Sequence, residues 1–170
     1  PLLGRLYTCS LVQRWSRDAD YYSTEWRSRV DQSGGSLYTQ AIHYLDVMLL
    51  AMGHVSKVCA NMATQAHEID VEDSLVTQFE FKNGALGTFE FTVNASRNLE
   101  AGLHILGENG RVAIGGPAAN EITAWEVPGL ASPELVPEKP NSYDGSYMGS
   151  PANHAAIYAN VADHILRGAP

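Results

Sequence analysis

The hydrophobic positions between residues 37 and 52 recur three or four residues apart, which is the periodicity of one face of an α-helix. Gly34 and Gly35 precede this segment, and glycine allows the backbone to turn tightly or to approach a ligand closely. We expect Ser36 to be the N-cap of the helix and Gly53 to end it. The pattern therefore predicts a helix over residues 37–52 that packs on a core.

A second face of this helix carries the polar residues Thr39, Gln40 and His43, and Asp46 follows nearly one turn later. A helix of this kind can pack on a core and also line a ligand-binding site. A single histidine has no motif specificity, however. The alternative is a half-buried His43 that hydrogen-bonds to a neighbour, with Asp46 as a solvated or capping carboxylate.

Most of the other hydrophobic positions alternate with polar ones, which is the period of a half-buried β-strand. Asn83-Gly84 between two such runs is a strong hairpin signal, and Glu108-Asn109-Gly110 predicts another tight turn. The predicted strands cover residues 4–15, 55–64, 75–81, 85–93, 101–105, 112–114 and 122–127, and a last helix covers residues 153–167. We expect an α+β fold: an open, mostly antiparallel sheet with helices on one face.

The second face of this predicted sheet has no predicted element to cover it. If its phenylalanines are exposed, oligomerisation is the usual way to bury them, so we expect a homo-oligomer formed through this open face. The 170 residues suffice for one domain with a core, and we expect residues 1–170 to form a single domain. The sequence lacks a strand–helix–strand unit with a glycine-rich phosphate turn, so it is not a dinucleotide-binding domain.

Residues 17–33 lack a sustained period but are rich in aromatic residues and arginine. One interpretation is a ligand-contacting loop, in which Arg27 pairs with a phosphate or carboxylate and Tyr22 or Trp26 stacks on a base or sugar. The other is a surface loop that covers the sheet edge. Residues 67–73 are acidic but lack the spacing of a calcium loop, which predicts an exposed, solvated turn. The proline-rich residues 128–151 predict an irregular connection.

Composition restricts the class of protein further. Hydrophobic residues make up 45% and charged residues 18% of the chain, as in ordinary soluble proteins, and the net charge of −8 disfavours a nucleic-acid partner. We expect no membrane span, because no apolar run reaches about 18 residues, and we expect a cytoplasmic location. Cys9 and Cys59 lie in apolar segments and are predicted to be buried and reduced. The histidines lack the spacing of zinc ligands, so no metal is expected.

The whole chain, taken in order, resembles the C-terminal domain of the Gfo/Idh/MocA family of NAD(P)-dependent sugar oxidoreductases. The resemblance is carried by the segments GGSLYTQAIHYLDVMLLAMG, VEDSLVTQFEFKNGALGTFEFT, ILGENGRVAI and DHILRGAP. It implies a sheet domain that supplies substrate contacts and the oligomer interface. It also implies an N-terminal Rossmann domain, absent from this chain, that binds most of the NAD or NADP. Since the sequence begins at Pro1, we expect it to be cut from a longer protein.

Within the family, four short segments resemble nucleotide-sugar 3-dehydrogenases, which oxidise the 3-hydroxyl of a UDP-N-acetylglucosaminuronate in surface-polysaccharide synthesis. These segments are Trp15-Ser16-Arg17, Tyr21-Tyr22, Glu25-Trp26-Arg27 and Gln40-Ala41-Ile42-His43. The resemblance implies His43 as the catalytic base. The substrate contacts that it implies are Arg14, Tyr22, Arg27, Thr39 and Gln40.

The family also uses a lysine of a Glu-Lys-Pro motif, which belongs to the absent Rossmann domain. Glu138-Lys139-Pro140 matches the letters but lies in the proline-rich connection, and we interpret the match as coincidence. This chain alone is therefore expected to be inactive. Thr39 stands where many members carry an Asp four residues before the histidine, which removes the histidine's usual polarising partner. The alternative hypothesis is a stand-alone, non-catalytic sugar-binding or assembly module of the same fold.

Overall fold

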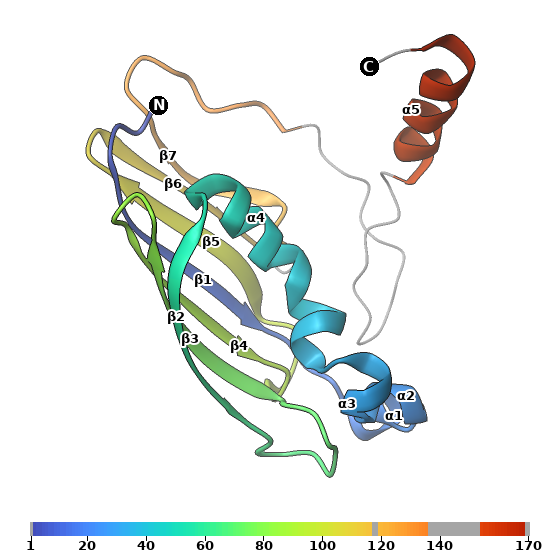
Figure 1. Cartoon of the computed structure of the whole chain (residues 1–170). Helices are drawn as coiled ribbons and strands as arrows, with labels where there is room; N and C mark the ends of the chain where they lie inside the picture. The colour runs from blue at the N-terminus through green and yellow to red at the C-terminus, as the bar shows by residue number, and fades with distance from the viewer. Residues whose placement is uncertain (1, 117–118, 136–153, 169–170) are drawn as a thin grey trace. The chain divides into compact units, whose positions relative to one another are not determined.

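The computed structural model describes residues 2–116, 119–135 and 154–168. The chain divides into two compact units, residues 1–133 and 134–170 (Figure 1). In the second unit, α5 (His154–Arg167) confirms the predicted last helix. The single domain over residues 1–170 stays a prediction. Most of the proline-rich connection, including the Glu-Lys-Pro letters, lies outside the described residues.

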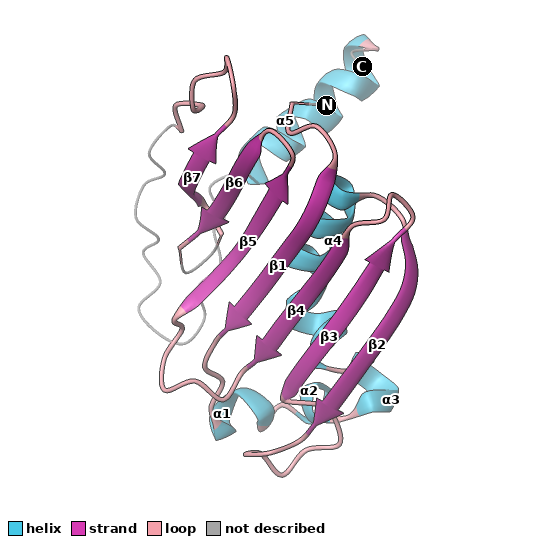
Figure 2. Cartoon of the chain, turned by 90° about the vertical axis from the view of Figure 1, so that its left-hand side faces the viewer, coloured by secondary structure: helices cyan, strands magenta, loops and turns pink. Residues whose placement is uncertain are grey.

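Seven strands among the described residues of the first unit form one sheet, in the order β2-β3-β4-β1-β5-β6-β7 (Figure 2). Five of their six pairings are antiparallel, and β1 pairs in parallel with β4. The strands are β1 (Leu6–Arg14), β2 (Val55–Ala63), β3 (Ser74–Phe81), β4 (Leu86–Thr92), β5 (Glu100–Gly107), β6 (Gly110–Gly115) and β7 (Glu121–Glu126). The α+β fold with an open, mostly antiparallel sheet is thus confirmed.

The described helices of the first unit lie on one face of this sheet (Figure 2). They are α1 (Ala19–Tyr22), α2 (Glu25–Ser28), α3 (Val30–Ser33), the π-helical turn η1 (Leu37–Ala41) and α4 (Ile42–Met52). The first three are single turns of four residues, which are too short to show a hydrophobic period. The loop predicted over residues 17–33 therefore contains three short helices.

The hydrophobic core lies between α4 and the sheet. Phe79 and Phe81 of β3 and Phe89 and Phe91 of β4 are all buried in it. The condition stated for the second face, exposed phenylalanines, is therefore not met by these four residues, because the alternation directs all of them towards the helix. The core positions contributed by α4 include Met48 and Met52, whereas Leu49, expected on the same stripe, remains 40% exposed.

The two cysteines differ in exposure. Both are free, but Cys9 is buried and Cys59 is exposed, so burial of Cys59 was predicted wrongly. The reason is that Cys59 pairs with the exposed Gln78 in the edge strand β2, on the face of the sheet that α4 does not cover. Burial raises the pKa of the Cys9 thiol to about 11. Within the described residues, no helix is both long enough and apolar enough to cross a bilayer.

Substitution of a phenylalanine in this core tests the orientation of β4. Phe89 is 0% exposed, and we expect Phe89→Ala to lower the free energy of unfolding by about 3–5 kcal/mol, because truncation leaves a cavity. Denaturant unfolding measures this change. Val76→Ala, at an exposed position of β3, is the control and should cost much less. Equal effects of the two substitutions would contradict the assigned faces.

Candidate functional site

The helix predicted over residues 37–52 consists of η1 followed directly by α4. Gly53 ends it as predicted, and its N–H donates to the Leu49 carbonyl at 2.8 Å. π-Helical turns are rare in proteins, and those that occur are often found at functional sites. Here the turn contains Thr39 and Gln40 and immediately precedes α4, which carries His43.

Ser36 occupies the N-cap position of η1 but makes no side-chain capping bond, so its predicted role is wrong. Its hydroxyl oxygen lies instead 3.4 Å from that of Tyr22. The Thr39 hydroxyl donates to the Gly35 carbonyl at 3.2 Å. Thr39 thus bonds back into its own segment, towards the beginning of the helix rather than towards His43.

His43 is exposed, which contradicts the alternative of a half-buried packing histidine. It lines a hollow of about 220 Å³ between α4 and the sheet, whose other walls are mostly apolar. The lining includes Leu11 of β1, Leu103 of β5 and Ile114 of β6. An exposed imidazole beside an apolar hollow can exchange a proton with a molecule bound there.

Gln40 lies below the surface at the beginning of the helix and is 4% exposed. Its backbone carbonyl accepts a hydrogen bond of 3.4 Å from the side chain of Gln13, a residue of β1 that is 0% exposed. Within the described part of the chain, both amide atoms of Gln40 and the Gln13 Oε1 lack hydrogen-bond partners. Buried polar atoms rarely stay unpaired, so these atoms indicate a place for water or for a polar group of a ligand.

Tyr22, whose hydroxyl lies beside Ser36, is also buried. Burial raises the pKa of the Tyr22 phenol, and the adjacent Ser36 hydroxyl opposes that shift. The structure therefore brings Tyr22, Thr39, Gln40 and His43 to the same end of the helix-covered face. Among them only His43 is exposed, and Tyr22 faces the protein interior.

Arg27 lies in an aromatic stack. Its guanidinium carbon is 4.3 Å from the ring centroid of Tyr21 and 5.3 Å from that of Trp26, and it donates to the Tyr21 carbonyl at 3.2 Å. Trp26 is exposed, so this stack has one open side. Arg27 does not line the hollow beside His43.

Arg14 is separated from the other predicted site residues. In β1 it alternates with Gln13 and so points to the open face, where it forms ion pairs with Glu90 and Glu100. The bond from its Nε to Glu90 Oε1 is 2.6 Å long, and this pairing raises the pKa of Arg14. The guanidinium is thus engaged on the face opposite the hollow.

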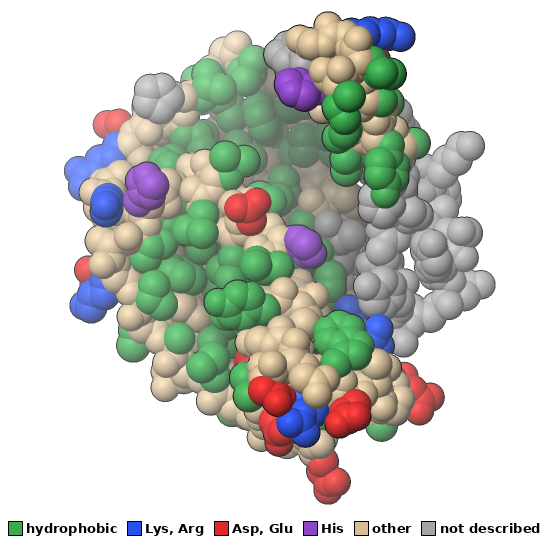
Figure 3. Space-filling view, turned by 45° about the vertical axis from the view of Figure 1, so that its right-hand side comes forward, with side chains coloured by type: hydrophobic (Ala, Val, Ile, Leu, Met, Phe, Trp, Pro, Cys, Tyr) green, Lys and Arg blue, Asp and Glu red, His purple; other side chains and the backbone are tan. Residues whose placement is uncertain are grey.

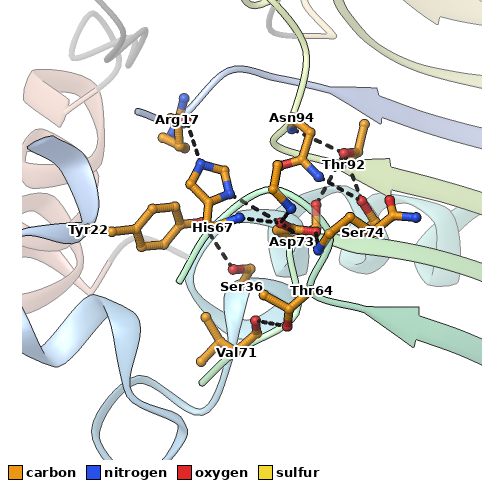
Figure 4. Close-up of polar contacts among 12 residues, drawn as sticks. Arg17, Tyr22, Ser36, Thr64, His67, Val71, Asp73, Ser74, Thr92 and Asn94 are labelled. Atoms are coloured by element: carbon orange, nitrogen blue, oxygen red, sulfur yellow. Dashed lines mark hydrogen bonds and ion pairs between the residues drawn. The ribbon is translucent and has the colours of Figure 1, made fainter. Parts of the chain in front are cut away.

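A polar network that the sequence did not reveal lies beside these residues (Figure 4). Asp73 is 0% exposed, and its carboxylate accepts the backbone N–H groups of Gln65 and Ala66 at 2.9 Å. One ring nitrogen of His67 lies 3.2 Å from this carboxylate and the other lies 3.0 Å from the Arg17 carbonyl. The exposed turn predicted over residues 67–73 is thus correct for Glu68 and Asp70 but wrong for Asp73, whose burial is compensated by backbone donors.

Burial raises the pKa of Asp73, but the backbone and side-chain donors around its carboxylate lower it more, to about 2. The network joins residues 64–73 to the segment that follows β1. No sequence signal distinguished Asp73 from its solvated acidic neighbours. Among the residues described, no group of three or more potential metal ligands is present.

The chain is thus an α+β sheet domain with a hollow between α4 and the sheet. The family model of the GFO/IDH/MocA C-terminal domain matches residues 2–113. The chain therefore belongs to this family, as its sequence resemblance indicated. Solved structures similar to this chain include dehydrogenases with NADH bound. A comparison with curated proteins gave no match.

Two similar structures are WlbA dehydrogenases in complex with NADH and UDP-GlcNAcA. The Chromobacterium violaceum enzyme is 37% identical, with a TM-score of 0.74 over 77% of this chain and 39% of that one. The Bordetella pertussis enzyme is 33% identical, with a TM-score of 0.77 over 98% of this chain and 45% of that one. A levoglucosan dehydrogenase with NADH and levoglucosan is 28% identical, with a TM-score of 0.63 over 71% and 35%. This chain thus spans less than half of these relatives.

The Asp73 network predicts a pH-dependent contribution to stability. Because the pKa of Asp73 in the folded state is about 2, its ionised carboxylate stabilises the fold above the unfolded-state value of about 3.9. We expect Asp73→Asn to cost about 2 kcal/mol at neutral pH, and the difference from the parent to vanish as the pH falls towards 2. Chemical unfolding at several pH values measures it.

Asp70→Asn is the matched control for that experiment, because Asp70 is exposed in the same loop. It should change stability little at any pH. A constant difference between Asp73→Asn and the parent across the acid range would contradict an ionised, stabilising carboxylate.

Proposed function

We propose that this chain is the substrate-binding and oligomerisation half of an NAD(P)-dependent sugar oxidoreductase. The substrate class is a nucleotide sugar such as a UDP-N-acetyl-hexosaminuronate, one hydroxyl of which is oxidised. The observation that carries the proposal is the exposed His43 beside an apolar hollow. It occurs in a chain at least 33% identical to two dehydrogenases with NADH and UDP-GlcNAcA bound.

The size of the hollow supports a site shared with another part of the protein. Its volume of about 220 Å³ lies below the roughly 300 Å³ at which complete small-molecule pockets begin. One wall of the site therefore lies on this chain. We propose that NAD or NADP binds mainly to an N-terminal domain, and that this chain alone is inactive.

The residues present fit a hydroxylated ligand beside a nicotinamide. The hollow is mostly apolar, as suits a flat ring, and the buried amide of Gln40 has hydrogen-bonding capacity to spare. The nicotinamide, when bound, accepts a hydride from the carbon that carries the reacting hydroxyl. His43 takes the hydroxyl proton at a ring nitrogen as the C–H and O–H bonds break and the carbonyl forms.

Other residues have supporting roles in this proposal. Thr39 and Gln40 contact the sugar from the beginning of the helix, and Arg27 offers its charge and the neighbouring open aromatic face to the nucleotide. Tyr22 supports Gln40 from behind, because its side chain is buried. Arg14 is left out of the substrate site, since Glu90 and Glu100 hold it on the other face.

A non-catalytic sugar-binding or assembly module is the second candidate. The observation that favours it concerns Thr39, which stands where many family members carry an Asp. Its hydroxyl donates to the Gly35 carbonyl, so this position has no carboxylate that could polarise His43. The two candidates share the hollow but differ in whether His43 transfers a proton. Substitution of His43 separates them.

We expect His43→Ala in the intact protein to lower kcat by about 10²-fold or more, the usual contribution of a general acid–base group. The measurement is NAD(P)H formation with a UDP-linked hexuronate. His54→Ala, at an exposed histidine just after the helix, is the control and should retain the parent rate. Parent-like turnover of His43→Ala would favour the non-catalytic module.

We also propose that a second copy of the chain covers the open face of the sheet. This face exposes Val76 and Leu86, and it contains two hollows of about 460 and 380 Å³. Both hollows are bordered by the beginning of β4, at Gly87 and Thr88. Exposed apolar side chains beside hollows of this kind are typical of a surface that another chain covers.

Thr88→Glu tests this assembly. A carboxylate at the centre of a buried face is desolvated without a partner, so we expect the oligomer to dissociate. Light scattering coupled to size-exclusion chromatography gives the mass. Lys82→Glu, in the hairpin turn between β3 and β4, is the control and should leave the mass unchanged. An unchanged mass for Thr88→Glu as well would contradict the proposed face.

A further inference from the structure

The first N–H groups of the helix that carries His43 need hydrogen-bond acceptors, as at every helix beginning. Ser36, at the N-cap position, supplies none. The Leu37 N–H donates instead to the Glu72 carboxylate at 2.6 Å, from a residue 35 positions later in the chain. A carboxylate at this end also interacts favourably with the helix dipole. Glu72 thus replaces the local cap.

Gly35 provides the space for this contact. Its φ of +108° lies in the left-handed region that favours glycine, and a Cβ atom at this position would lie 2.7 Å from Glu72 Oε2. The glycine before the helix therefore permits close approach of a carboxylate of the same chain. The sequence had suggested a tight turn or a ligand at this point.

Glu72 itself is held by its neighbours. Val71 before it is buried, and its carbonyl accepts a hydrogen bond of 2.7 Å from the Thr64 hydroxyl. Asp73 after it is the centre of the buried network (Figure 4). The Asp70 N–H donates to the Ser28 carbonyl at 2.9 Å. The loop is anchored at several points, so the carboxylate is presented to Leu37 with little freedom.

We propose that Glu72 is a positioning residue for His43. It fixes the beginning of η1, and His43 follows within two helical turns on the continuous helix. The other residues that line the hollow beside His43 are mostly apolar, so they offer few polar groups to orient its ring. Hydrophobic side chains are also numerous on the face of the molecule seen in Figure 3. The orientation of the imidazole therefore depends on the helix backbone. The catalytic consequence rests on the proposed function, whereas the structural contact does not.

Amide hydrogen exchange in the intact protein tests the contact. We expect Glu72→Ala to accelerate exchange at residues 37–41 about tenfold, the scale of a lost helix cap, and Glu72→Gln to accelerate it less, because the amide oxygen can still accept. Glu68→Ala, at an exposed acid of the same loop, is the control and should leave exchange at parent rates. No acceleration in Glu72→Ala, or equal acceleration in the strands of the sheet, would overturn the proposal.

Steady-state kinetics of the same variants test the catalytic consequence. We expect kcat of Glu72→Ala to fall about tenfold with KM changed by less than about twofold, and Glu72→Gln to recover most of the rate. A parent-like kcat with accelerated exchange would overturn the positioning role. If His43→Ala also turns over normally, the proposed function fails, while the exchange result still decides the contact between Glu72 and Leu37.

Discussion

The buried carboxylate of Asp73 is the constraint on which the structure around the beginning of the His43 helix depends. An ionised group without solvent contact is tolerated only where donors surround it, and here backbone N–H groups of its own loop do so. The same carboxylate faces His67, whose other ring nitrogen reaches the Arg17 carbonyl. One charge thus connects the loop before β3 with the segment after β1. Glu72, the preceding residue, extends this connection to the helix that carries His43.

The two faces of the sheet differ in what they carry. The face under α4 buries the phenylalanines and ends at the hollow beside His43. The other face carries the ion pairs of Arg14 and two broad hollows, and no described helix of the first unit covers it (Figure 2). Because adjacent residues of a strand point to opposite faces, neighbours such as Gln13 and Arg14 contribute to different surfaces. In the proposed function, substitutions on one face therefore alter substrate contact and substitutions on the other alter assembly.

Local periodicity was sufficient to predict much of this arrangement. The spacing over residues 37–52 placed His43, Thr39 and Gln40 on the helix, and alternation located all seven strands. The same alternation contained the signal that Arg14 faces away from Leu11. Periodicity carries no information on strand neighbours, however, so it did not place β1 beside β4. Nor could it reveal the π-helical turn or the burial of Asp73, which depend on contacts between residues distant in the chain.

The role of His43 as the catalytic base is tested most directly by a crystal structure of the intact protein with its nicotinamide cofactor and a UDP-linked hexuronate. We expect the reacting hydroxyl to lie about 3 Å from a ring nitrogen of His43, within hydrogen-bond reach, on the α4 side of the sheet. We also expect a second copy to cover the open face. A sugar bound away from His43, or on the open face, would rule out His43 as the base that takes the hydroxyl proton.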